Sequence, residues 1–271
     1  MSPSKWDARI ERARALEKVY PFASEGLRFY EQLAQAQKSI YGELKSRLGK
    51  VRKPLPPGGL RQELDFTFLL PRLGPFLSAI ERCAPAALAQ SAQAMRGKSE
   101  DHFKNVLARF WEAGSLSSAQ LEPSEALLSW AFLQPYAECL ADSTECSAIH
   151  ETPSSCPLCS GKPQVGVLRQ EGDGAKRSLI CALCAHEWEY RRLICPDCGE
   201  EDVHKLAIYF ADGITHVRVD ACDTCRHYTK TVDLTKDGHA VPVVDELATM
   251  PLNLWATEHG YTKSETNLLG L

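Results

Sequence analysis

Four Cys-x-x-Cys pairs constrain the fold of this 271-residue chain more than any other feature of its sequence. Two cysteines separated by two residues can place both sulfurs on one cation in a tight turn. A second pair then completes a tetrahedron with metal–sulfur distances of about 2.3 Å. Four pairs therefore predict two metal ions, each bound by four thiolates. The predicted ligands are Cys156, Cys159, Cys181, Cys184, Cys195, Cys198, Cys222 and Cys225.

The spacing of the pairs favours sequential partnering. Between the first and second pairs lie 21 residues, and between the third and fourth lie 23, which is close to the spacing of zinc ribbons and sufficient for a β-hairpin. An interleaved cross-brace, with first to third and second to fourth, stays open as the alternative. The ten residues 185–194 between the second and third pairs read as one strand, which would keep the two sites apart.

The turns of the pairs carry further signals. Pro157 and Pro196 preset the backbone after the first cysteine of their pairs, and Gly199 can adopt the left-handed conformation that turns backbone N–H groups toward a sulfur. The turn geometry is left open at the three equivalent positions, which hold Ser160, Ala185 and Arg226.

Ligand type does not separate iron from zinc, because four thiolates in a tetrahedron suit both metals. Zinc would be structural, whereas iron would permit one-electron chemistry. A structural zinc site contributes roughly 10–16 kcal/mol, comparable to the net stability of a domain at about 5–15 kcal/mol. The cysteine-rich half is therefore expected to need its metals to fold.

The N-terminal segment lacks the apolar core and small-residue cleavage site of a secretory signal. The most apolar stretch, residues 126–133, is far shorter than the roughly 20 residues of a membrane-spanning helix. Eleven cysteines in such a chain favour metal binding over disulfides, because cytosolic thiols stay reduced. We expect a cytoplasmic protein without membrane insertion.

The hydrophobic pattern predicts an α+β protein. Residues 6–141 show helical periodicity, with helices expected at 24–48, 76–83, 85–95, 99–113 and 124–141. Ser24 is the predicted N-cap of the first of these and Gly49 its stop, and Pro135 is expected to kink or end the last one. Cys83, Cys139 and Cys146 have no ligand-spaced neighbour and read as ordinary thiols.

A polar stretch at 142–155 predicts a domain boundary near residue 150, giving a helical domain at 1–150 and a tandem four-cysteine region at 151–271. Short strands are expected at 164–169, 177–180, 187–193, 206–210, 214–219 and 228–234. These predict two rubredoxin-like or zinc-ribbon modules with short antiparallel strands. A C-terminal helix is expected at 245–258, with Leu247, Met250, Leu254 and Trp255 on its packed side.

No motif of a catalytic site is present, and four thiolates leave a metal no open coordination position, so we expect no enzyme. The histidines at 186, 204, 216, 227 and 239 read as surface or strand residues. A zinc-ribbon protein that binds nucleic acid or acts in transcription is the alternative. Residues 156–241 hold 11 Lys and Arg against 13 Asp and Glu, a balance that disfavours binding to phosphates.

The cysteine half contains, in this order, CPLCSGKP at 156–163, CALCAHEW at 181–188, CPDCGEED at 195–202, CDTCRHYTKTVD at 222–233 and the tail VDELATMPLNLWATEHGY. In these segments and their order it resembles the formate dehydrogenase accessory protein family, FdhE. In many relatives a glycine occupies the position of Ser160.

The resemblance implies a cytoplasmic maturation factor that binds the catalytic subunit of a respiratory formate dehydrogenase before export. It implies paired rubredoxin-like modules, with the eight paired cysteines as ligands of two iron or zinc ions. The sequence does not decide whether the protein has a redox role, which of its surfaces binds the catalytic subunit, or whether it forms a homodimer.

Overall fold

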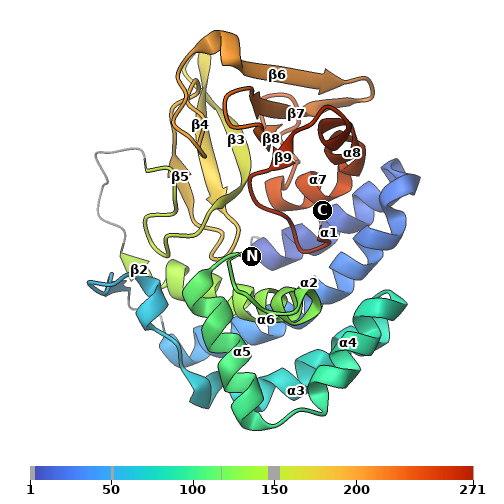
Figure 1. Ribbon diagram of the computed structural model, residues 1–271, viewed down its shortest axis with the longest axis vertical. Coiled ribbons are helices and arrows are strands. Elements are labelled where there is room, and N and C mark those ends of the chain that lie inside the picture. Colours follow the sequence, from blue (N-terminus) through green and yellow to red (C-terminus); the bar gives the residue numbers. More distant parts are fainter. Residues whose placement is uncertain (1–3, 50–51, 117, 146–152, 271) are drawn as a thin grey trace.

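A computed structural model describes residues 4–49, 52–116, 118–145 and 153–270 of the chain. Helices of the N-terminal half fill one part of the molecule, and a seven-stranded mixed sheet followed by two helices fills the other (Figure 1). This arrangement confirms the predicted α+β class. The expected boundary near residue 150 lies outside the described residues, so the division into two domains stays a prediction.

Six α-helices occur in the described N-terminal part: α1 (Lys5–Val19), α2 (Ser24–Leu48), α3 (Phe66–Cys83), α4 (Ala86–Arg96), α5 (Glu100–Ala113) and α6 (Pro123–Asp142). The predicted bounds of α2 are confirmed, and Gly49 ends it with φ 75° and an N–H bond to the Lys45 carbonyl. Ser24 is not an N-cap, because a 3-10 helix at Pro21–Ala23 leads directly into α2. α3 starts ten residues before its predicted start at 76.

Of the two effects predicted for Pro135, a kink or an end of the helix, the structure excludes the end, because α6 continues past it. A proline at this position cannot donate to the carbonyl of Ala131, which would leave that buried acceptor without its helical partner. The side-chain amide of Gln37 on α2 donates to the Ala131 carbonyl instead, at 2.7 Å. The helix therefore continues to Asp142 because a neighbouring helix replaces the missing donor.

The sheet has the strand order β5-β4-β3-β8-β7-β6, with β9 also paired to β8. Its strands are β3 (Pro163–Glu171), β4 (Gly174–Cys181), β5 (Glu187–Glu189), β6 (Leu206–Ala211), β7 (Ile214–Cys222), β8 (His227–Asp233) and β9 (Thr262–Lys263). The short β1 (Lys53–Pro54) and β2 (Thr144–Glu145) pair separately in the helical part. In each half of the sheet, one hairpin connects two Cys-x-x-Cys turns, as the spacing predicted.

Two features of the sheet differ from the predicted pair of separate antiparallel modules. β3 pairs with β8 in parallel, which joins both hairpins into one continuous mixed sheet. The strand expected at 187–193 is only three residues long, because the chain turns away after Glu189.

The predicted C-terminal helix is two helices, α7 (Pro242–Ala248) and α8 (Met250–Glu258). The break falls at Thr249, since Pro251 has no N–H for the Leu247 carbonyl and restricts the residue before it. Leu247 is buried, but Leu254 is 63% exposed and does not face the core. α7 packs against α1, β3 and β8, between the sheet and the helical part (Figure 1).

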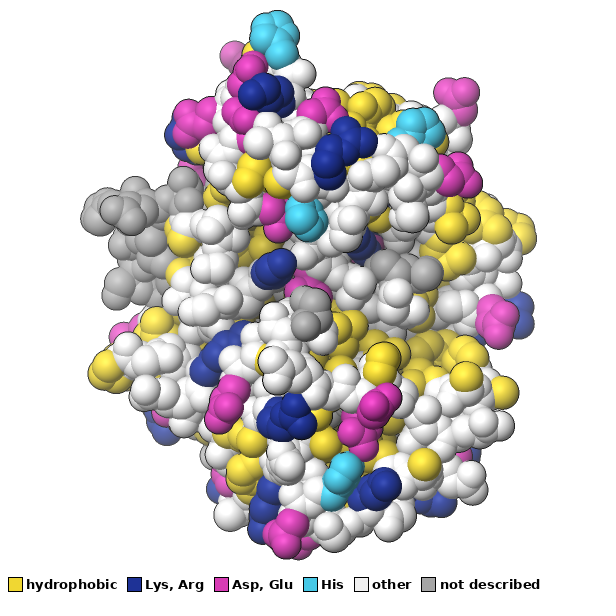
Figure 2. Space-filling view, viewed as in Figure 1, with side chains coloured by type: hydrophobic (Ala, Val, Ile, Leu, Met, Phe, Trp, Pro, Cys, Tyr) yellow, Lys and Arg dark blue, Asp and Glu magenta, His cyan; other side chains and the backbone are white. Residues whose placement is uncertain are grey.

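None of the described helices is long and apolar enough to span a lipid bilayer. On the face shown in Figure 2, basic and acidic side chains are interspersed over both parts of the molecule. This distribution does not favour binding to the phosphates of nucleic acid.

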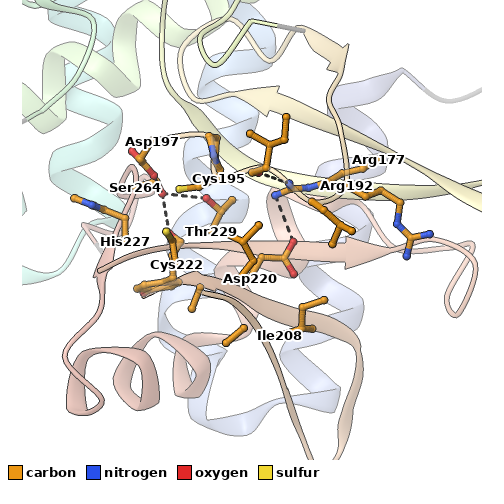
Figure 3. Close-up of a pocket in the computed structure, with 17 residues that line it drawn as sticks. Arg177, Arg192, Cys195, Asp197, Ile208, Asp220, Cys222, His227, Thr229 and Ser264 are labelled. Atoms are coloured by element: carbon orange, nitrogen blue, oxygen red, sulfur yellow. Dashed lines mark hydrogen bonds and ion pairs between the residues drawn. The ribbon is translucent and has the colours of Figure 1, made fainter. Parts of the chain in front are cut away.

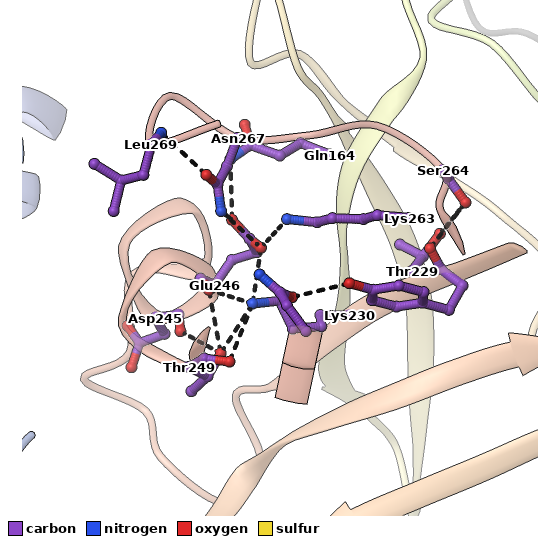
Figure 4. A network of polar contacts seen from close by, with 12 residues as sticks. Gln164, Thr229, Lys230, Asp245, Glu246, Thr249, Lys263, Ser264, Asn267 and Leu269 are labelled. Atoms are coloured by element: carbon purple, nitrogen blue, oxygen red, sulfur yellow. Dashed lines mark hydrogen bonds and ion pairs between the residues drawn. The ribbon is translucent and has the colours of Figure 1, made fainter. Parts of the chain in front are cut away.

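A buried ion cluster ties the C-terminal tail to the sheet (Figure 4). Glu246 on α7 lies 2.9 Å from the ammonium of Lys230 on β8, and both side chains are fully buried. Lys263 and Asn267 of the tail also bond to the Glu246 carboxylate. Burial opposes ionisation of both members of the pair. The two lysines nevertheless lower the pKa of Glu246 to about 2, while burial lowers the pKa of Lys230 to about 8.

Glu246→Gln should reduce the free energy of unfolding by about 3–5 kcal/mol at pH 7, because Lys230 would keep a buried charge without its counter-ion. The wild-type carboxyl has a pKa below its ordinary value, so its contribution is complete above pH 4.5 and is lost as the pH falls toward 2. Urea denaturation between pH 3 and 7 measures both effects. The exposed Glu258→Gln is the matched control, and an equal loss in both variants would contradict this assignment.

Candidate metal sites

The structure gathers the eight paired cysteines into two groups of four, in the sequential arrangement. The first group is Cys156, Cys159, Cys181 and Cys184, and the second is Cys195, Cys198, Cys222 and Cys225. Within each group, all four sulfurs lie within 4.8 Å of one another. The cross-brace is not formed.

The sulfur spacing fits a metal tetrahedron. Contacts between the two pairs of a group are 3.4–3.5 Å in the first site and 3.7 Å in the second. A tetrahedron with metal–sulfur bonds of about 2.3 Å has edges of about 3.8 Å, whereas a disulfide would bring two sulfurs to about 2.05 Å. Both groups therefore have the dimensions of a four-thiolate site for one cation.

All four Cys-x-x-Cys turns share one backbone geometry. The residue after the second cysteine has a positive φ in each turn and donates its N–H to the carbonyl of the first cysteine at 2.8–3.1 Å. Gly199 was expected to do this. The other three turns reach the same geometry with non-glycine residues, namely Ser160 (φ 57°), Ala185 (φ 51°) and Arg226 (φ 60°). Each such residue costs roughly 1–2 kcal/mol, so the surrounding contacts must impose the turn.

Gly161 is a further requirement of the first site that the sequence analysis missed. A Cβ added here would lie 3.0 Å from the Cys181 sulfur and 3.3 Å from the Cys159 sulfur. Its carbonyl accepts the Cys156 N–H at 2.8 Å. The two residues after Cys159 therefore meet two separate requirements. Ser160 adopts the left-handed conformation of the turn, and Gly161 allows the backbone to lie close to the sulfurs.

The thiols of the first site cannot all ionise without a compensating charge. Burial raises the pKa of Cys181 and of Cys184 well above the ordinary value, and the neighbouring thiols hold the pKa of Cys159 well below it. The Cys159 sulfur therefore carries a negative charge most readily, because the neighbouring thiols stabilise that charge. A bound cation would supply the charge that allows all four to act as thiolates.

In the second site, backbone N–H groups partly offset the effect of burial on the pKa values of the thiols. Burial raises the pKa of Cys195 strongly, although the N–H groups of Asp197 and Cys198 act against it. Burial likewise raises the pKa of Cys225 to about 11. For Cys222, the N–H groups of the following turn and the Cys198 thiol outweigh burial, and its pKa is lowered.

The first Cys-x-x-Cys turn is docked on the helical part through a short 3-10 helix, Leu60–Gln62. The Leu60 N–H donates to the Leu158 carbonyl at 2.9 Å, and the Arg61 Nε donates to the Cys159 carbonyl at 2.6 Å. Arg61 also bonds to the Trp111 carbonyl on α5. This turn therefore has a fixed position against the helices.

The second Cys-x-x-Cys turn is docked on α6. The indole N–H of Trp130 and the side-chain amide of Gln134 both donate to the Ala182 carbonyl at 3.1 Å. All four cysteines of the first site are at most 2% exposed. The first site thus lies at the junction of the sheet with the helical part, where it holds the two together.

The second site lies nearer to solvent. Cys198 is exposed and Cys225 is half-buried. A shallow hollow of about 30 Å³ beside Cys195 and Cys222 is bordered by the exposed side chains of Leu193 and Ile208 (Figure 3). The second site therefore has one exposed cysteine, Cys198, and exposed apolar side chains beside its buried cysteines, Cys195 and Cys222.

The second site is also tied to the C-terminal tail. The Ser264 hydroxyl bonds to the Asp197 carboxylate and to Thr229 on β8 (Figure 3). Movement of the tail and of the third Cys-x-x-Cys turn would thus be coupled.

A third cluster of potential ligands, His216, Asp237 and Asp245, already contains a cation. The guanidinium of Arg12 on α1 lies 2.6 Å from both carboxylates, and the His216 ring bonds to Asp245 at 2.8 Å. We interpret this cluster as an ion pair that connects α1 to the sheet. Cys83 and Cys139 belong to no metal-like cluster within the described residues, and burial raises the pKa of both.

In protein carrying both metals, a chromogenic chelator should remove them in two phases that differ at least tenfold in rate. The fast phase belongs to the second site, because the chelator reaches exposed Cys198 without local unfolding, whereas the first site must open. The double variant Cys198→Ser/Cys225→Ser should lack the fast phase and keep the slow one. Persistence of the fast phase in that variant would contradict the assignment.

The fold and the two sites define a class: two rubredoxin-like four-cysteine modules joined in one sheet and docked on a helical part. Two family models match this region, described as "FdhE, central domain" over residues 155–192 and "FdhE, C-terminal domain" over residues 181–269. The chain belongs to the FdhE family.

Full-length similarity supports this membership. A protein named as an FdhE homolog from Aquifex aeolicus is 26% identical over 96% of this chain and 94% of its own length. The homolog from Pseudomonas aeruginosa is 37% identical, over 45% of this chain and 42% of its own length. A crystal structure of an FdhE protein from Pseudomonas aeruginosa superposes with a TM-score of 0.75 at 26% identity, covering 99% of this chain and 97% of that one.

Proposed function

We propose that this chain is an accessory factor in the formation of formate dehydrogenase. It binds the catalytic subunit of that enzyme, here called the client, in the cytoplasm before export. The observation that supports this role is the presence, in a member of the FdhE family, of two four-sulfur clusters with the dimensions of metal sites. The eight cysteines hold two ions of iron or zinc, one per site.

The two sites serve different purposes in this proposal. The first is structural, because its sulfurs are buried and its turns are bonded to the 3-10 helix and to α6. The second site forms the client-binding surface, because Cys198 is exposed and the exposed apolar side chains of Leu193 and Ile208 border the hollow beside Cys195 and Cys222. The protein acts by binding rather than catalysis, since four thiolates leave its metals no open position. Iron at the second site would add one-electron transfer to the client.

Client capture tests the role of the second site. The Cys195→Ala/Cys198→Ala variant should recover at least tenfold less catalytic subunit than wild type in co-purification, because the turn that shapes the surface is lost. The Leu193→Asp/Ile208→Asp variant should show a similar loss while keeping both metals, because it changes only the apolar surround.

The control is Cys83→Ala, a thiol outside both clusters, which should capture the client at the wild-type level. Equal recovery by wild type and both second-site variants would remove this surface from client binding. Failure of the wild-type protein to capture any catalytic subunit would contradict the proposed function itself.

A further inference from the structure

A cleft of about 730 Å³ separates the C-terminal tail from the helical part. Hydrophobic side chains gather in the hollow between these parts on the face shown in Figure 2. The helical wall comes from α4, the segment after α5 and the start of α6. Its half-buried leucines are Leu88, Leu116, Leu121 and Leu127. The volume lies within the roughly 300–1,000 Å³ range of protein ligand sites, and such sites often lie between domains.

The opposite wall carries a buried acid whose carboxylate has no side-chain partner among the described residues. Glu265 is only 6% exposed, and no side-chain hydrogen bond or ion pair reaches it within that part of the chain. The hydroxyl oxygen of its neighbour Thr266 is also buried without a partner there. Burial raises the pKa of Glu265 to about 7, although Lys162, the Thr266 N–H and Lys263 act against this rise. Buried polar groups are normally paired, so this wall has the character of an incomplete site.

The charges around Glu265 indicate which chemical group of a ligand would complete this site. Lys162 lines the same cleft and its ammonium donates to the Ser264 carbonyl at 3.5 Å, while Lys263 is bonded to the Glu246 carboxylate, so neither lysine forms an ion pair with Glu265 in the part of the chain that the structure describes. A ligand cation beside Glu265 would pair with the single carboxylate among the described residues that line the cleft. The four leucines require apolar groups on the same ligand.

We propose that this cleft binds an apolar peptide segment that carries one basic side chain, with the cation paired to Glu265 and the apolar side chains packed on the leucine wall. This inference rests on the proposed function, because it assigns the segment to the client polypeptide. The cleft is a second contact, distinct from the surface around Cys198.

A fluorescein-labelled peptide, Gly-Leu-Leu-Arg-Leu-Leu-amide, and its Arg→Gln and Arg→Glu analogues test the cleft by fluorescence anisotropy at pH 8. Wild type should bind the arginine peptide at least tenfold more tightly than the glutamine peptide, and the glutamate peptide most weakly. In Glu265→Gln the preference for arginine over glutamine should fall to near onefold. That variant should fold, because it removes an uncompensated buried charge.

Leu88→Asn should weaken binding of the arginine and glutamine peptides alike, because it alters the apolar wall and not the acid. The exposed Glu258→Gln should match wild type. Thermal melts of each variant establish that it is folded. No saturable binding by wild type, or an arginine preference unchanged in Glu265→Gln, would overturn the inference.

The two proposals fail in different ways. Wild type that captures the catalytic subunit but does not bind the peptides would overturn the cleft and leave the proposed function standing. Wild type that binds the peptides with the expected preference but captures no catalytic subunit would overturn the proposed function and its assignment of the segment to the client.

Discussion

Close packing of four sulfurs around one point, twice in the chain, is the constraint on which the rest of the structure depends. Thiolates at 3.4–3.7 Å repel one another unless a cation lies between them, so the proposed metals turn an unfavourable arrangement into a cross-link. Each cross-link joins the two ends of one β-hairpin. The parallel pairing of β3 with β8 then makes the two hairpins one sheet, and the bonds from Trp130 and Gln134 attach that sheet to the helices.

The two sites differ because their surroundings differ, although their turns are alike. The 3-10 helix and α6 bond to the turns of the first site, and its four cysteines are buried, which suits a structural cross-link. The second site is closed on one side by the C-terminal tail, through Ser264, and open on the other at Cys198. The Lys230–Glu246 pair fixes the start of that tail, and Glu265 lies just beyond it. Lys230, Glu246 and Glu265 thus place buried charged groups where the tail meets the sheet.

Local patterns predicted much of this structure from the sequence. The Cys-x-x-Cys spacing predicted the sequential grouping, and hydrophobic periodicity placed α2, α5 and most strands within a few residues. The errors have non-local causes: α6 passes Pro135 because Gln37, almost 100 residues away, supplies a donor. The parallel β3–β8 pairing and the burial of Glu265 likewise depend on segments distant in sequence. Left-handed turns at Ser160, Ala185 and Arg226 were not predictable from residue preference, because it favours glycine there.

The central claim is that two metal ions complete the two sulfur clusters. Metal analysis combined with X-ray absorption spectroscopy on anaerobically purified protein tests it most directly. The account predicts close to two transition-metal ions per chain, each with four sulfur neighbours at about 2.3 Å and no oxygen or nitrogen ligand. Folded protein that contains almost no transition metal, or metal with fewer than four sulfur neighbours, would contradict it.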